Sequence, residues 1–234
     1  MFKEKERLIN MLDKNKISKE DYKLLSKALN SKGVYLCRFF AMLLNPFQKI
    51  AGLNALLMGF SIIILMSFIG VTAKLYFPGV ISCLNSVVIK NPQHQLNFIF
   101  LLYENVLCWF ILSVLFITSA KILQKKDTRM IDFFGTVALS RYPFLVLTVF
   151  IAFIQIINSE LMNIDLSKGL QVHMSPMMIA LTFVTIICVI WQVITYLSAL
   201  KVSSGLQGTK LWISFIISIT LGEMISSFLT MMFI

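Results

Sequence analysis

Five long runs of apolar residues constrain this chain more than any other feature of its sequence. They cover residues 53–75, 98–120, 143–157, 177–200 and 211–234. A helix needs ~20 apolar residues to cross the hydrocarbon of a bilayer, and only the third run is shorter than that. Because lipid offers the backbone no hydrogen-bond partner, each run must form a helix. The predicted fold class is therefore all-α: a polytopic membrane protein with a five-helix transmembrane bundle over residues 52–234.

The composition and the N-terminal sequence agree with this class. Hydrophobic residues make up 58% of the chain and charged residues 14%, and the mean hydropathy is +0.83. Soluble domains contain about 25% charged residues. The first thirty residues alternate charged with single apolar residues and contain no apolar h-region, so we expect no cleaved signal peptide and a retained N-terminus.

The distribution of Lys and Arg predicts the orientation in the membrane. Residues 1–51 hold eleven of the 21 basic residues, 121–141 hold five, and 201–210 hold two. Basic residues concentrate in cytoplasmic segments, so the N-terminus is predicted to be cytoplasmic and the C-terminus outside. The net charge of +10 is then a topology signal that faces anionic lipid head groups. No basic patch interleaved with aromatics indicates nucleic-acid binding.

Neither a cofactor nor an enzymatic reaction is indicated by the sequence. The four cysteines stand singly, without the spacing of metal ligands or disulfide pairs. Two histidines, His94 and His173, fall in the two predicted outer loops; they could share a metal, but solvated side chains are the favoured interpretation. No HExxH, P-loop or nucleophile motif occurs. We therefore expect a non-enzymatic protein.

Residues 1–32 are predicted to form a cytoplasmic helical hairpin. Ser18 is placed as the N-cap of its second helix, and Asp21 completes a capping box. The stretch "RLINMLDKNKISKEDYKLLSKAL" resembles the short helical-hairpin (SHOCT-like) motif, which implies docking or oligomerisation. The residues assigned to docking are Leu12, Ile17, Ser18, Tyr22 and Leu25. The alternative is a frayed amphipathic pair lying on the membrane surface.

Residues 33–51 are predicted to form an interfacial amphipathic helix. Aromatic residues such as Phe39 and Phe40 alternate there with basic residues such as Arg38, a mixture that suits the head-group plane. Pro46 is expected to end or kink this helix.

Polar residues inside the apolar runs are candidate functional residues, because a charged group at the bilayer centre costs ~2.5–3.5 kcal/mol on insertion scales. Glu104 lies about six residues into the second run and Glu223 about twelve into the fifth, which places both in the outer half of the membrane at ~1.5 Å per residue. Lys74 and Gln155 are predicted to complete an intramembrane polar cluster. Three interpretations of Glu104 remain open: a buried cross-helix partner, a proton-coupled or solute-binding group, and a side chain that snorkels to the surface.

Small residues recur at four-residue spacing in the fifth run: Ser214, Ser218, Gly222 and Ser226. Such a stripe lets another helix approach closely. Packing within the chain is the usual use of such a stripe, and an interface with another protein is the alternative.

Three segments resemble the Yip family of multi-pass membrane proteins. "NPFQKIAGL" (45–53) resembles the family's entry segment, "KKDTRMIDFFGTVALSRYPFLVL" (125–147) its loop before the third span, and "WQVITYLSALKVSSGLQGTK" (191–210) its exit from the fourth. The resemblance implies a five-span protein of the bacterial cytoplasmic membrane.

From the resemblance and the residues together we expect a non-enzymatic membrane adaptor that organises a partner complex. An ATP-driven (ABC-type) exporter is the partner that the resemblance implies, and a second copy of the chain is another candidate. Membrane lipids surround the bundle in either case. The alternative function is a proton-coupled transporter or channel that uses Glu104 and Glu223.

Overall fold

The chain divides into two compact units in a computed structural model, residues 1–46 and residues 47–234. The structure describes residues 10–12, 14, 17–18, 20–22, 43–48, 50, 52–72, 97–124, 129–157 and 176–231. The predicted start of the bundle was residue 52. The second unit begins earlier because Phe47 is buried against Ala55, Leu139 and Ala199.

The first unit contains the predicted capping box. Residues 10–12 and 20–22 are helical. Ser18 Oγ accepts a hydrogen bond from the backbone N–H of Asp21 at 3.0 Å, and the Asp21 carboxylate accepts from the Ser18 hydroxyl at 2.7 Å and from its backbone N–H at 3.4 Å. These reciprocal bonds satisfy donors at the helix start that the helix itself leaves unpaired. Leu25 lies outside the described residues.

Loss of this cap gives a first testable prediction. Ser18→Ala is expected to lower the free energy of unfolding of the hairpin by ~1 kcal/mol, because the Asp21 N–H loses its acceptor. The change is measured by unfolding the tagged full chain in denaturant and using proteolytic cleavage within residues 1–32 as the readout. Asn10→Ala is the control, since Asn10 is exposed and takes no part in the box. Equal protection in Ser18→Ala and wild type would contradict the prediction.

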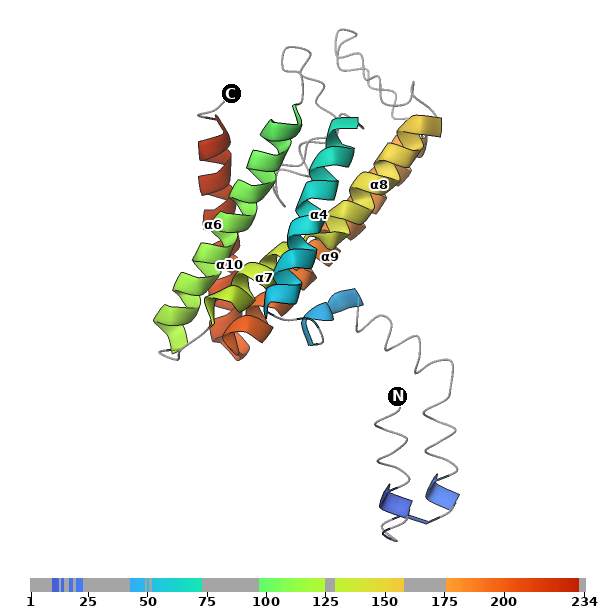
Figure 1. The fold of residues 1–234 in the computed structure, drawn as a ribbon, viewed down its shortest axis with the longest axis vertical. Coiled ribbons are helices and arrows are strands. Elements are labelled where there is room, and N and C mark those ends of the chain that lie inside the picture. Colours follow the sequence, from blue (N-terminus) through green and yellow to red (C-terminus); the bar gives the residue numbers. More distant parts are fainter. Residues whose placement is uncertain are drawn as a thin grey trace. The chain divides into compact units, whose positions relative to one another are not determined.

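The second unit is built from helices, with no strand among its described residues. A short 3-10 helix, η1, covers Pro46–Gln48. The α-helices are α4 (Gly52–Thr72), α6 (Phe98–Gln124), α7 (Met130–Leu139), α8 (Tyr142–Ile157), α9 (Pro176–Ser204) and α10 (Gly208–Met231). In Figure 1, α6 lies beside α10, α8 lies beside α9, and α4 crosses α7. The predicted all-α fold class is confirmed.

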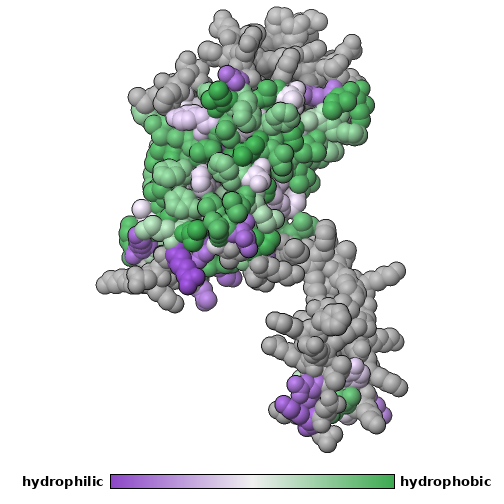
Figure 2. Space-filling model, viewed as in Figure 1, coloured by the Kyte–Doolittle hydropathy of each residue, from purple (hydrophilic) through white to green (hydrophobic). Residues whose placement is uncertain are grey.

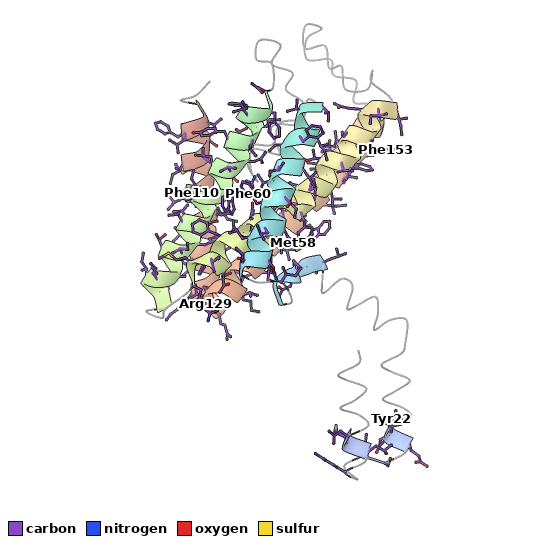
Figure 3. All side chains as sticks on the ribbon, viewed as in Figure 1. Tyr22, Met58, Phe60, Phe110, Arg129 and Phe153 are labelled. Atoms are coloured by element: carbon purple, nitrogen blue, oxygen red, sulfur yellow. The ribbon has the colours of Figure 1, made fainter. Side chains whose placement is uncertain are left out.

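Five segments of the described chain are long and apolar enough to cross a membrane, the third being α7 and α8 taken together. Figure 2 shows hydrophobic residues covering the visible face of the helices. The labelled side chains of Met58, Phe60, Phe110 and Phe153 are exposed on α4, α6 and α8 (Figure 3). Large apolar side chains around the whole bundle are expected where lipid is the solvent. The chain is a multi-pass membrane protein.

The third span differs from its prediction. The sequence indicated a short helix over 143–157 preceded by a cytoplasmic loop over 121–141, but residues 130–139 of that loop form α7 and are largely buried. The loop prediction is wrong for these residues. The helix breaks at Ser140 and Arg141 because Pro143 has no N–H for a helical bond and its ring clashes with the carbonyl of Leu139.

α7 is largely buried, with six of its ten residues enclosed. Gly59 of α4 lies so close to α7 that a Cβ there would overlap Ala138 and lie 2.5 Å from the backbone nitrogen of Leu139. On α6, the Trp109 indole donates a hydrogen bond to the carbonyl of Phe134 at 2.9 Å. On α9, the hydroxyl of Ser203 lies 2.8 Å from that of Thr136. Three helices therefore fix the position of α7.

The small-residue stripe of α10 packs inside the molecule. Its four members are Ser214, Ser218, Gly222 and Ser226, all of them buried. A Cβ on Gly222 would meet Leu112 and Leu115 of α6, each at 3.5 Å. Of the two interpretations of the stripe, the structure supports helix packing within the chain.

Exposed basic residues gather at one end of the bundle. Lys121 is near the end of α6, Arg129 precedes α7, and Lys201 and Lys210 flank the turn between α9 and α10. Figure 2 shows hydrophilic residues at this end, and Figure 3 labels Arg129 there. The positive-inside rule predicts that this end faces the cytoplasm.

The predicted orientation can be tested with single cysteines in a background where the native cysteines are serine. Asn97→Cys, which is exposed before α6, is expected to react with an impermeant maleimide on intact cells. Gln207→Cys, exposed in the turn before α10, is expected to react only after the membrane is opened. Mass-shift labelling measures both. The reverse pattern would invert the predicted orientation.

Candidate functional site

Arg141 is buried at the break between α7 and α8, with 4% of its surface exposed. Its Nη1 donates a hydrogen bond to Oδ1 of Asn105 at 2.7 Å. The amide nitrogen of Asn105 donates in turn to Ser67 Oγ at 3.1 Å and to the carbonyl of Leu101 at 2.9 Å. Ser67 Oγ donates to the carbonyl of Ile63 at 2.9 Å. A continuous chain of hydrogen bonds therefore links Arg141 to α6 and α4.

Hydrogen bonds hold the break that positions Arg141 against α9. The Thr195 hydroxyl donates to the carbonyl of Ser140 at 3.2 Å, and the Ser140 hydroxyl donates to the carbonyl of Thr136 at 2.7 Å. A break in a membrane helix frees backbone groups, and hydroxyl side chains commonly satisfy them. On the next residue, the Tyr142 hydroxyl accepts a hydrogen bond from the Trp191 indole at 3.1 Å. The backbone around Arg141 is thus fixed on both sides.

Both predicted acids lie near Arg141. Glu104 is 2% exposed and precedes Cys108 by one turn of α6. Cys108 interacts electrostatically with Arg141, Glu104 and Glu223, so one side chain is the common neighbour of all three charged groups. α6 and α10 run side by side (Figure 1), and Gly222, next to Glu223, lies against Leu112 of α6.

A small cavity lies between these helices, with a volume of about 20 Å³. Its lining residues are Cys108, Leu112, Arg141, Phe144, Tyr196, Ile219, Gly222, Glu223 and Ser226. Arg141 also interacts with the Tyr196 hydroxyl. The Nε atom of Arg141 is buried and has no hydrogen-bond partner among the residues that the structure describes. A cavity above ~10–15 Å³ can hold one water if polar partners are present.

The structure thus brings together only part of the predicted polar cluster. Glu104 and Glu223 share the site, and the burial of Glu104 argues against snorkelling. Gln155 does not belong to it, because it follows Arg141 by fourteen residues along α8, about 20 Å at 1.5 Å per residue. Lys74 lies outside the described residues. The cation beside the acids is Arg141, which the prediction had counted among the cytoplasmic loop charges.

Sequence reasoning missed Arg141 because the basic residues of 121–141 were read together as a topology signal. The missed signal is the apolar stretch "FFGTVALS" (133–140), which directly precedes Arg141 and makes it an arginine within one long apolar segment. Gln192 was also missed. Its side chain is fully buried one turn from Tyr196 on α9, and neither amide atom has a hydrogen-bond partner in the described part of the chain.

The fold and this site define a polytopic helical membrane protein with an ionisable centre inside the bundle. Among the described residues, no group of three His, Cys, Asp or Glu side chains could hold a metal ion. His94 and His173 fall outside that part of the chain. No protein-family model, curated protein or solved structure matches this sequence.

Proposed function

We propose that this protein is a non-enzymatic integral membrane adaptor that organises a partner membrane complex. In this proposal it is a Yip-like, five-span protein of the bacterial cytoplasmic membrane. The basic end of the bundle and the N-terminal hairpin face the cytoplasm, and the C-terminus is outside. The partner is another membrane protein complex, with an ABC-type exporter as the first candidate.

The size of the cavity beside Arg141 is the observation that carries this proposal. At about 20 Å³ it has room for one water, whereas sites for small-molecule ligands measure ~300–1,000 Å³. Around it, Arg141, Asn105 and Ser67 are joined by hydrogen bonds that cross three helices. A cross-linked polar layer of this kind supports a structural role in holding the bundle together more than a role in passing a solute.

Docking in this proposal is assigned to the hairpin, residues 1–32, and not to the small-residue stripe. All four stripe residues are buried within the chain, so α10 cannot also present them to a partner. The hairpin includes the capping box of Ser18 and Asp21, and a sequence of about thirty residues lacks the core to fold independently. A partner surface would supply the missing burial.

The proposal is tested by purifying the tagged full-length protein from native membranes in mild detergent and identifying the proteins that remain bound. A stoichiometric membrane complex is expected with wild type, and its loss is expected on deletion of residues 1–32. Glu20→Gln is a matched control, because Glu20 is exposed in the hairpin and lies outside the capping box. Retention of the partner after the deletion would refute docking by the hairpin.

The alternative is a proton-coupled transporter or channel, which the electrostatic interaction of Cys108 with both Glu104 and Glu223 favours. Glu104→Gln separates the two functions. An adaptor should retain partner binding and growth or export phenotypes, since the amide preserves size and hydrogen bonding. A proton-coupled protein should stay folded and lose activity, since an amide cannot titrate. Glu104→Leu leaves buried polar neighbours without a hydrogen-bonding partner, so it should lower the thermal stability in both cases.

A further inference from the structure

The basic end of the bundle carries a net positive charge among its described residues. None of its exposed basic residues, Lys121, Arg129, Lys201 and Lys210, forms an ion pair with a described residue. Asp132 is the one acidic residue in the described part of this end. Its Oδ1 lies 3.7 Å from the position that a Cβ on Gly52 would take, at the first residue of α4. A carboxylate is favourable at a helix N-terminus, so the excess of positive charge remains at the surface.

Three of these basic residues lie on chain segments that meet at one place. The Ser203 hydroxyl, near the end of α9, donates a hydrogen bond to the carbonyl of Asp132 in the first turn of α7 at 3.4 Å. Arg129 is one turn earlier, and its carbonyl accepts from the Asp132 N–H at 3.1 Å. Lys201 is two residues before Ser203, and the short turn after α9 leads directly to α10, whose third residue is Lys210. Positive side chains from three helix ends therefore start close to one another.

Large apolar side chains are exposed beside these charges. Each of the three basic residues has one within two positions along the chain: Met130, 51% exposed; Val202, 42% exposed; and Trp212, 53% exposed. Tryptophan together with Lys and Arg is typical of the membrane–water interface, where long basic side chains keep their stems in apolar surroundings and extend their charge to the head groups. This mixture favours a lipid as the occupant over the acidic surface of a soluble protein.

We propose that Arg129, Lys201 and Lys210 form a binding site for the phosphate head group of an anionic phospholipid, whose acyl chains lie against the exposed apolar residues beside them. Arg129 is suited to hold two phosphate oxygens at once, and the two lysines act as point charges on flexible stems. Charge complementarity makes the site selective for anionic over zwitterionic lipids. The site is independent of the adaptor function, because it follows from the charge and exposure of this end alone.

Lipid titrations of the purified full-length protein in neutral-detergent micelles test the site, with native mass spectrometry counting the bound lipids. Dioleoyl phosphatidylglycerol is the anionic probe and dioleoyl phosphatidylcholine its zwitterionic match. Wild type is expected to prefer phosphatidylglycerol by ~10-fold or more. Arg129→Gln, Lys201→Gln and Lys210→Gln should each lower the affinity for phosphatidylglycerol about fivefold, the equivalent of ~1 kcal/mol per basic residue, and leave that for phosphatidylcholine unchanged. Lys14→Gln, exposed in the hairpin, should change neither.

Three results would overturn the proposal. Equal affinity of wild type for the two lipids would leave these charges to topology or to an acidic protein partner, and this comparison needs no variant to fold. A preference for phosphatidylglycerol that survives the triple Gln variant would place the anionic site elsewhere. We expect millimolar glycerol phosphate at constant ionic strength not to displace the lipid, since it has no acyl chains; displacement would show a site for soluble phosphate instead.

Discussion

Replacing Arg141 with methionine is expected to lower the free energy of unfolding of the bundle by about 3–5 kcal/mol, the cost of leaving buried charges without their partner. The loss arises because the positive charge is removed from beside Cys108, which also interacts with Glu104 and Glu223, and because Asn105 Oδ1 loses a donor at 2.7 Å. Unfolding titrations in mixed micelles measure the change. Arg129→Met is the matched control, since Arg129 is exposed before α7, and it should change stability little.

A compensated variant makes this prediction specific to charge. Arg141→Met combined with Glu104→Gln and Glu223→Gln removes the acids along with the base, so most of the lost stability should return. If the single variant is as stable as wild type, Arg141 does not neutralise the acids. If the triple variant is no better than the single one, the loss comes from packing of the arginine side chain instead.

Gly59→Ala is the second substitution with a large expected effect. A single added carbon would overlap Ala138 and the adjoining backbone of α7, and backbone cannot move aside as the tip of a side chain can. Overpacking of this kind costs ~1–3 kcal/mol, and the cost should lie at the upper end because α6 and α9 also fix α7. Thermal unfolding in detergent is the measurement.

Gly222→Ala provides the matched comparison on α10. Its new carbon would make ordinary contacts of 3.5 Å with Leu112 and Leu115, so we expect a stability close to that of wild type. The contrast between the two glycines tests the packing directly. Equal tolerance at both positions would show that α4 and α7 are farther apart than the structure has them.

The membrane-spanning helices could be predicted from the sequence because a backbone in lipid must satisfy its own hydrogen bonds. Each of the five predicted spans corresponds to a helical segment of the structure. The largest disagreement is α7, whose ten residues were assigned to a loop. The apolar run that begins at Pro143 predicts a short helix. The burial of residues 130–139 before it becomes clear only from the contacts of Gly59, Trp109 and Ser203 with α7.

The site was less predictable because it depends on which helices are neighbours. Helical rise predicts one depth for Glu104 and Glu223, and their shared interaction with Cys108 agrees with neighbouring positions. Their neighbour Arg141 could not be predicted, since a basic residue beside a loop is usually a topology signal. Gln155 and Glu104 have similar sequence environments, yet only Glu104 interacts with Cys108 beside Arg141. That difference is set by the break at Ser140 and Arg141, which sequence periodicity does not reveal.

The position of Arg141 within the third span also has a consequence for biogenesis. Ribosomal synthesis proceeds from the N-terminus, so Ser67 and Asn105 are already in the membrane when Arg141 emerges, while Tyr196 and Glu223 are still to be made. An arginine at the centre of an inserting segment costs ~2.5–3.5 kcal/mol. We expect Asn105, its nearest hydrogen-bond acceptor, to receive Arg141 first. The electrostatic partners complete the layer only when the last helix leaves the ribosome.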